Sequence, residues 1–453
     1  MKTLDHSSRT SYTFAAIGAL LLFFTACDTG TDSMNDEEAV TVSGRVTDDN
    51  QSSESTHTAK SSEPSATGVE GAVITAVAVA ADGSVSTLNG ETTTDVNGEF
   101  SFVAEGEGAT DHIRILANSD GDYESSVIVQ VNGRNSVQTR PLTAETHAEA
   151  EVYLEAKAND DADSHEEGVM AADVAVFVNG DVAAAINTGE QSAAEIGAAI
   201  ANSVMTRAEY NANAEAGVDM AAVAVAKLEA FAEYQAELAA ASEAEARAEA
   251  VAALEEAYVN IFADAGADAE TQAELHQAGT FLLMEASGDV SGNAETGLRK
   301  KAEIIRTHAT ALALKAMFEA EGASESTIQA IADARAAFVS EMKAAADMDA
   351  IIEAKNDFSA VIDVEVESHF DISSEIRAAA AAEMQGHVEL FKSTLAALSI
   401  FASTIADEAA EAYATFHAEA KSNTRAVLEN SGMTEAEASA AAEIIVMANV
   451  GGE

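Results

Sequence analysis

The 453-residue chain lacks tryptophan and contains one cysteine, two prolines, and 23 basic residues against 78 acidic ones. A single cysteine has no disulfide partner within the chain and excludes CxxC chemistry. The formal charge of −55 repels nucleic acid and anionic lipid surfaces, so neither is expected as a binding partner. Both prolines, Pro64 and Pro141, lie in the first third of the chain, which leaves the remainder open to long helices.

The cysteine, Cys27, lies where an apolar run ends. The run from Phe14 to Ala26 has about 13 residues, fewer than the roughly 20 that span a bilayer core, and this length suits a secretory signal peptide. The residues Phe24-Thr25-Ala26 resemble the lipobox of bacterial lipoproteins, although Leu is usual in place of Phe24. The resemblance implies cleavage before Cys27, a diacylglycerol thioether on its sulfur and an acylated new N-terminus. The alternatives are an ordinary cleaved signal and a transmembrane anchor.

An acidic segment follows the cysteine and contains Asp36-Glu37-Glu38. It resembles the surface-export signal of lipoproteins from Bacteroidetes-type bacteria, whereas Asp28 would indicate inner-membrane retention under the enterobacterial rule. We favour the first interpretation, which predicts a lipid-anchored cell-envelope protein at the outer membrane or cell surface. A periplasmic face is the alternative.

The excess of acid over lysine is typical of a halophile's surface. Disorder is the competing interpretation of a high net charge. It conflicts with a hydrophobic content of 47% and with the periodic spacing of the apolar residues. At molar salt the screening length falls to about 3 Å, so self-repulsion between surface charges largely disappears. We therefore expect a folded chain that requires salt.

The composition changes near residue 158, from Thr, Val, Ser and Gly to Ala and Glu. A length of 453 residues also exceeds what one hydrophobic core usually organises. The sequence predicts a multidomain chain, β then α, with a signal peptide (1–26), an acidic tether (27–38), a β domain (39–157), an acidic hinge (158–168) and a helical domain (169–453).

The β domain is expected to contain short strands separated by turns. Phe100 and Phe102 alternate with polar residues and are interpreted as core. Asn97-Gly98 predicts a tight turn with positive φ at both positions. The segment AEAEVYLEA (148–156) is expected to close the domain.

Four motifs of this region, VSGRVTD, GVEGAVITA, TTTDVNGEFSF and DYESSVIVQV, resemble the carboxypeptidase regulatory-like domain. The resemblance covers residues 39–157 and implies a seven-stranded, prealbumin-type β-sandwich that acts as an accessory module without catalytic residues. The chain departs from the family by an inserted Ser/Thr-rich loop at 49–68. Some relatives of this fold bind glycans through exposed aromatic residues, for which Tyr123 and Tyr153 are the remaining candidates here.

Capping boxes predict where helices of the helical domain begin, and glycines predict where they end. The predicted boxes are Ser192 with Glu195, Thr271 with Glu274, Ser326 with Gln329, and Thr434 with Glu437. Helix ends are predicted at Gly266, Gly288, Gly322 and Gly432. Residues 169–187 fit neither helix nor strand clearly.

Two apolar seams favour an antiparallel bundle of long helices. The shorter one is Val251, Leu254, Tyr258 and Ile261. The longer one is an unbroken coiled-coil-like series of Met384, Val388, Phe391, Leu395, Leu398, Ala402, Ile405, Ala409, Ala412 and Phe416. An extended rod, or an oligomer assembled through these seams, is the alternative.

The chain contains no HExxH, GxSxG, P-loop or CxxC pattern. The Glu-x-x-His pattern of ferritin-like sites is also absent. His308 is interpreted as a partly buried helix residue. His276, His387 and His417 are far apart in sequence and would form a metal cluster only if the fold brought them together.

One cation site has a recognisable spacing. NSDGDYE places Asn118, Asp120, Asp122 and Glu124 at alternate positions around a glycine, as calcium loops do. It lacks the full twelve-residue pattern, so a plain Asp-Gly turn between two strands is the favoured interpretation. No cofactor is expected, and Ca²⁺ at this loop is the alternative.

These observations predict a non-enzymatic, lipid-anchored envelope protein with a structural or interaction role and an unidentified protein or glycan partner. A glycan- or polymer-binding module serving a partner transporter is the second hypothesis. An enzyme with a histidine or carboxylate site among the helices is the third.

Overall fold

The computed structural model describes residues 39–48, 67–109, 112–119, 123–131, 133–158, 167–214, 217–241, 244–288, 292–399 and 406–450. Cys27 and the rest of the predicted signal peptide and tether lie outside these ranges. So do most of the inserted loop and residues 159–166 of the predicted hinge.

The strands precede the helices, as the sequence predicts. They are β1 (Ala39–Arg45), β2 (Thr47–Asp48), β3 (Thr67–Gly68), β4 (Val73–Val79), β5 (Val85–Thr93), β6 (Glu99–Glu105), β7 (His112–Ser119), β8 (Tyr123–Gln130) and β9 (Ser136–Gln138). Seven of them form one sheet in the order β8-β7-β4-β5-β6-β1-β9, and β2 pairs with β3. Neighbours in the sheet are antiparallel except for β1 and β9, so the sheet is mixed.

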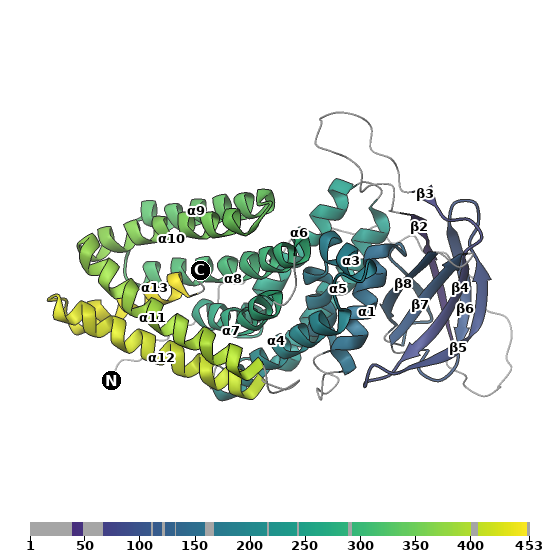
Figure 1. The fold of residues 1–453 in the computed structure, drawn as a ribbon, viewed down its shortest axis with the longest axis horizontal. Helices are drawn as coiled ribbons and strands as arrows, with labels where there is room; N and C mark the ends of the chain where they lie inside the picture. The colour runs from purple at the N-terminus through teal and green to yellow at the C-terminus, as the bar shows by residue number, and fades with distance from the viewer. Residues whose placement is uncertain are drawn as a thin grey trace, which may run out of the picture. The chain divides into compact units, whose positions relative to one another are not determined.

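The sheet curls around its own hydrophobic core (Figure 1). Alternate residues of β6 point inward, and both predicted core residues, Phe100 and Phe102, are buried there with their rings 6.4 Å apart. The register between β4 and β5 shifts after Thr75, and an irregularity of this kind bends a strand and increases its twist. The curl follows from burial of one face together with this irregularity.

The turn before β6 differs in detail from the prediction. Gly98 has a φ of 78°, but Asn97 is not among the described residues with positive φ. The Asp95 carboxylate instead accepts hydrogen bonds from the backbone N–H groups of Asn97 (2.8 Å) and Glu99 (2.9 Å). Asp95 therefore stabilises the turn that the sequence predicts from Asn97-Gly98 alone.

The segment predicted to close the β domain is a helix, α1 (Ala144–Ala158). Within this segment Ala148, Val152 and Ala156 are spaced four residues apart, so they lie on one face of a helix. All three are buried. Alanine, leucine and glutamate favour a helix more than a strand. The change from strand to helix thus falls between Gln138 and Ala144.

Helix α1 connects the sheet to the other helices (Figure 1). On one side Glu151 pairs with Arg114 of β7, and His147 Nδ1 lies 3.1 Å from Ser126 Oγ of β8. On the other side, a Cβ on Gly197 would lie within 2.9 Å of α1 backbone atoms, so the absence of a side chain permits this close approach. Residues from β4, β8 and α1 share one hydrophobic core with the remaining helices.

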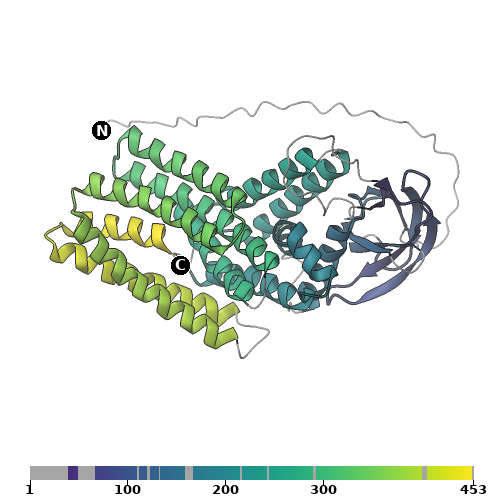
Figure 2. The same cartoon turned by 45° about the horizontal axis from the view of Figure 1, so that its top comes forward.

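Twelve more helices follow in the described ranges (Figure 2). They are α2 (Glu167–Phe177), α3 (Gly180–Asn187), α4 (Ala193–Asn213), α5 (Met220–Ala240), α6 (Ala244–Asp264), α7 (Ala269–Gly288), α8 (Asn293–Ala320), α9 (Glu325–Ala344), α10 (Met348–Phe370), α11 (Ser374–Ser399), α12 (Ala406–Asn430) and α13 (Glu435–Asn449). The unassigned segment 169–187 is therefore helical. Asn179 separates α2 from α3 and caps α3 by accepting from the N–H groups of Asp181 and Val182.

Two of the four predicted caps are confirmed. Ser192 caps α4, and Thr434 forms the complete capping box with Glu437 at the start of α13. The other two are wrong, because the capping side chains of α7 and α9 belong to Asp268 and Ser324. Gly266, Gly322 and Gly432 have positive φ just after helices, whereas Gly288 is the last residue of α7.

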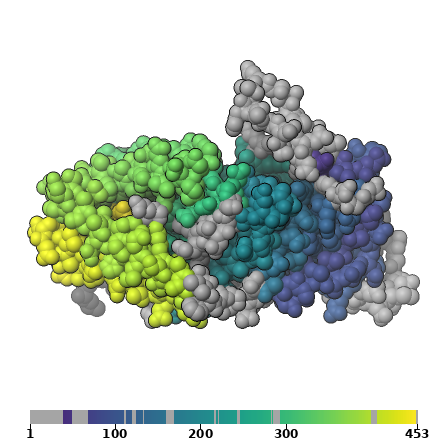
Figure 3. Space-filling model, in the orientation of Figure 1, coloured from purple at the N-terminus to yellow at the C-terminus, as the bar shows by residue number. Residues whose placement is uncertain are grey.

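The shorter seam is confirmed, since its last three residues are buried on α6. The longer seam is not continuous, because it is divided between α11 and α12, and Ala402 and Ile405 lie outside the described residues. The two helices pack side by side (Figure 1), with the rings of Phe391 and Phe416 5.1 Å apart, and residues of the two helices form adjoining yellow-green and yellow surfaces in Figure 3. The apolar series therefore holds a helical hairpin together.

Candidate functional site

Five ionisable side chains from five helices meet inside the helical core. Each is at most 1% exposed. They are Asp173 of α2, Arg207 of α4, Lys227 of α5, Tyr258 of α6 and His276 of α7. A group of this kind is stable only when its charges are paired.

Asp173 is the anion of this cluster. One carboxylate oxygen accepts a hydrogen bond from the Arg207 guanidinium, and the other lies 3.3 Å from the Lys227 ammonium. Arg207 also donates to the Tyr258 hydroxyl, and Lys227 Nζ lies 3.2 Å from the centroid of the Tyr258 ring, a cation–π contact. One carboxylate thus faces two cationic groups.

Burial sets the protonation of the cluster. It lowers the pKa of Lys227 well below its ordinary value, which the nearby Asp173 only partly counteracts, and Arg207 lowers it further. Burial likewise raises the pKa of the Tyr258 phenol and lowers that of His276, so both rings stay uncharged near neutral pH. A lysine with a depressed pKa is a potential nucleophile, but this one is enclosed by the helices around it.

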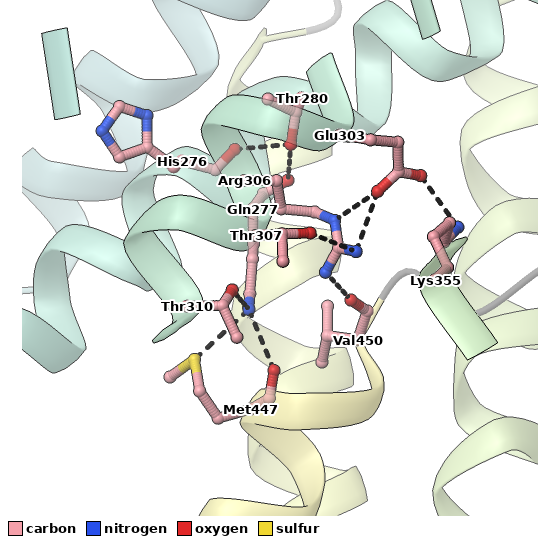
Figure 4. Close-up of polar contacts among 10 residues, drawn as sticks. All are labelled: His276, Gln277, Thr280, Glu303, Arg306, Thr307, Thr310, Lys355, Met447 and Val450. Carbon is pink, nitrogen blue, oxygen red and sulfur yellow. Dashed lines mark hydrogen bonds and ion pairs between the residues drawn. The ribbon is translucent and has the colours of Figure 1, made fainter. Parts of the chain in front are cut away.

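A second polar network joins α8, α10 and the residue that follows α13 (Figure 4). Glu303 of α8 accepts hydrogen bonds from Arg306 and lies 2.8 Å from the Lys355 ammonium of α10. Arg306 donates in addition to the backbone carbonyl of Val450, just after α13. The burial of Glu303 would raise its pKa, but the two cations hold it below its usual value.

Gln277 of α7 occupies the centre of the same view (Figure 4). Its amide nitrogen lies 3.1 Å from Thr310 Oγ1 of α8 and 3.3 Å from the carbonyl oxygen of Met447 of α13. Its amide oxygen accepts from the Tyr413 hydroxyl of α12 at 2.7 Å. Through these contacts one side chain fixes the positions of α7, α8, α12 and α13.

Two carboxyl groups meet near this network, at the contact of α7 with α13. Glu270 shares a hydrogen bond with Glu443, and burial together with this neighbour raises the pKa of Glu270 to about 8. Lys421 of α12 pairs with Glu443. One turn along α7, Glu274 accepts from the Tyr210 hydroxyl at 2.6 Å and lies 3.4 Å from His417 Nδ1.

The structure describes half of the predicted calcium loop. Asn118 and Glu124 are exposed and lie opposite each other in the antiparallel pair of β7 and β8, while Asp120 and Asp122 lie outside the described residues. The motif therefore joins two strands, as expected. Within the described ranges, no three His, Cys, Asp or Glu side chains are placed to hold a metal ion together.

The histidines have separate surroundings. His276 packs between the rings of Tyr258 and Phe262, and His387 Nε2 lies 2.9 Å from the Asn423 side chain. His308 is half-buried, as predicted, and burial lowers its pKa to about 4. The fold does not bring these side chains together as a metal cluster.

The buried charges were not identified from the sequence. Arg207 and Lys227 lie 20 residues apart among alanines and acids, where they are indistinguishable from surface residues. The sequence did contain an indication that Asp173 is buried, because this residue interrupts the apolar run VMAADVAVFV. A lone acid inside a buried run indicates a buried partner.

Comparison of the chain with protein-family models, with curated proteins and with solved structures gave no match. Among the described helices, none is by itself long and apolar enough to cross a membrane. The pair Gly168–Phe177 and Gly180–Asn187, bent by 90°, meets that requirement jointly by length and composition.

Proposed function

We propose that the chain is a lipid-anchored cell-envelope protein of a halophile, with a non-enzymatic structural or interaction role. The observation that carries this proposal is the position of Cys27, the only cysteine, directly after FTA at the end of a short apolar run. In this proposal the sheet is a prealbumin-type β-sandwich that serves as an accessory module, and the helices form an antiparallel bundle.

The buried ion pairs support a structural role. Asp173, Lys227 and Tyr258 resemble a reactive constellation most closely, yet each is at most 1% exposed, so a substrate would reach them only if the helices separated. Glu303 and Gln277 are also buried and contact side chains on neighbouring helices. Such networks define how helices align and add little to net stability.

The aromatic residues of the first 158 residues favour this proposal over a glycan-binding module. Phe100, Phe102 and Tyr153 are buried, and a sugar platform requires exposed rings. The side chain of Tyr123, the other candidate, lies outside the described side chains.

Replacement of the cysteine tests the anchor. Wild-type protein and Cys27→Ser should be expressed in a bacterium that processes lipoproteins, with Thr25→Ser as a control that keeps the residue small. We expect wild type and control to yield an N-terminal peptide that begins with diacylglyceryl-Cys27 and to fractionate with membranes, whereas Cys27→Ser yields no lipidated peptide. A wild-type N-terminus without lipid would contradict the proposal. Protease treatment of intact cells would then distinguish the outer surface from the periplasmic face.

A further inference from the structure

A groove of about 330 Å³ lies between α11 and α12, the two helices of the hairpin. The buried side chains of Phe391 and Phe416 form its floor. On the α11 side the lining includes Leu390 and Leu398, and Leu390 is 60% exposed. An apolar surface that is open to solvent between two helices is the kind of surface on which a further helix packs.

The α12 side of the groove is acidic. Glu408, Glu411 and Glu419 line it, and all three side chains are exposed. Among the described residues no ion pair involves Glu408 or Glu411, and Glu419 lies 3.8 Å from His387 Nδ1. The described lining contains no lysine or arginine, so no permanent cation within the groove balances these carboxylates. The groove therefore has one apolar side and one anionic side.

The groove is long enough for about three helical turns. Its lining extends from His387 to Leu398 on α11 and from Glu408 to Glu419 on α12, and at about 1.5 Å per residue each span measures about 16 Å. The backbone groups of both helices are engaged in their own hydrogen bonds, so an extended strand in the groove would leave its N–H and C=O groups without partners. A helix satisfies its own backbone and can bury an apolar face there.

We propose that this groove binds an amphipathic helix of a partner protein, with an apolar stripe against Leu390, Phe391 and Phe416 and with basic side chains beside the three glutamates. A second copy of the chain does not match, because it also carries a net charge of −55 and would place acidic helix faces against the same glutamates. A polyamine would leave the apolar floor uncovered, and a hydrocarbon chain would leave the glutamates unpaired. Docking of this kind rests on the interaction role proposed above, although not on the lipid anchor.

Three labelled peptides of about 15 residues test the docking by fluorescence anisotropy on the full chain. The first carries leucine at helical spacing, lysine along one flank of the leucine stripe and alanine elsewhere. The second has the same composition in an order without helical periodicity, and the third has glutamate in place of lysine. At about 1 M NaCl the screening length is about 3 Å, which suppresses non-specific attraction between a cationic peptide and an acidic surface.

We expect the first peptide to bind saturably, about tenfold or more tightly than the second, because only the first presents a continuous apolar stripe. It should bind about threefold or more tightly than the third, because the third faces the glutamates with like charge. Absence of saturable binding of the first peptide, or equal binding of either of the others, would overturn the proposal.

Substitutions locate the site. Leu390→Gln should weaken binding of the first peptide about fivefold or more, because a polar side chain replaces the exposed apolar wall. Glu408→Gln combined with Glu411→Gln should weaken it about twofold or more. Glu233→Gln combined with Glu237→Gln removes two exposed charges from α5, outside the groove, and should leave binding unchanged. All variants should retain the wild-type helical circular dichroism. Wild-type binding by the groove variants, or an equal loss in the α5 variant, would refute the assignment.

The variant Cys27→Ser separates docking from anchoring. It lacks the cysteine on which lipid attachment depends and should bind the first peptide as the wild type does. Loss of binding in this variant alone would contradict a groove that acts independently of the anchor.

Discussion

Asp173 is the carboxylate that both Arg207 and Lys227 contact in the helical core. Removing one partner of a buried ion pair leaves a charge without compensation, which costs more than the pair itself contributes. Replacing one of the two basic residues therefore has a different effect from replacing their shared acid. Loss of Lys227 leaves a matched pair of Asp173 and Arg207, whereas loss of Asp173 leaves the buried Arg207 guanidinium without an anion.

We predict that Asp173→Asn lowers the free energy of unfolding by about 3–5 kcal/mol. Lys227→Met should lower it by less, because an apolar side chain of similar length fills the same volume beside the Tyr258 ring. Chemical denaturation of both variants in molar salt would measure the difference. Equal losses in the two variants, or a loss in Asp173→Asn below about 1 kcal/mol, would contradict this account of the cluster.

This cluster illustrates what a single sequence conceals. Periodicity identified Tyr258 as a core residue, since it belongs to the seam of α6. It could not show which helices pack against that seam, and therefore which polar residues become buried with it. The pairing of Asp173 with Arg207 depends on contacts between elements 34 residues apart.

The contact between α7 and α13 depends on pH. Glu270 meets Glu443 there, and the other charged or titratable groups facing the pair are Glu274 of α7 and His417 and Lys421 of α12. The pKa of Glu270 is raised to about 8, so its protonated form stabilises the folded state. That stabilisation is complete below the ordinary value of about 4.5 and is lost as the pH rises through about 8. Glu443, whose pKa is lowered, acts in the opposite direction at acid pH.

We therefore predict that the melting temperature of the chain falls between pH 6 and pH 9, and that Glu270→Gln reduces this fall. The amide keeps the hydrogen bond to Glu443 but cannot become charged. Glu411→Gln, an exposed substitution on α12, is the matched control and should retain the wild-type pH dependence. A fall of equal size in Glu270→Gln and wild type would show that the carboxyl pair is not responsible.

Helix boundaries could be predicted where one capping signal stood alone. Thr434 and Glu437 satisfy the capping-box pattern without a competitor and form it. Thr271 matches the same pattern, but Asp268 lies three residues earlier and its side chain accepts the N–H of Thr271. The pattern thus recurred inside the first turn of α7. Two equally good capping residues within one turn cannot be ranked without knowing where packing begins.

The order of strands before helices followed from composition, but the way in which they are joined did not. The sequence predicts that residues 148–156 close the β domain, because apolar residues alternate in the chain before residue 158. In the structure the same residues belong to the helix α1, and Val152 and Ala156 lie on one face of it. The cavity of about 230 Å³ between the start of α1 and the helices α5 and α6 could not be anticipated for the same reason, since it forms only if α1 is a helix.

The net charge of −55 acts on the molecule as a whole. On the exposed faces of the described helices acidic residues outnumber basic ones, so like charges repel one another. At about 10 mM salt the screening length is roughly 30 Å and like charges repel across the fold, whereas at 1 M it is roughly 3 Å. Repulsion of this kind destabilises a compact chain.

We predict that the chain loses helical circular dichroism at 222 nm on dialysis from molar NaCl into dilute buffer, and regains it when salt is restored. NaCl and KCl should act alike at equal ionic strength, since screening depends on charge and concentration alone. Sucrose at a concentration of matched water activity is the control, because it favours burial without screening charges. A helical signal that is equal in molar salt and dilute buffer would contradict the dependence on screening, and full recovery by sucrose alone would assign it to hydration instead.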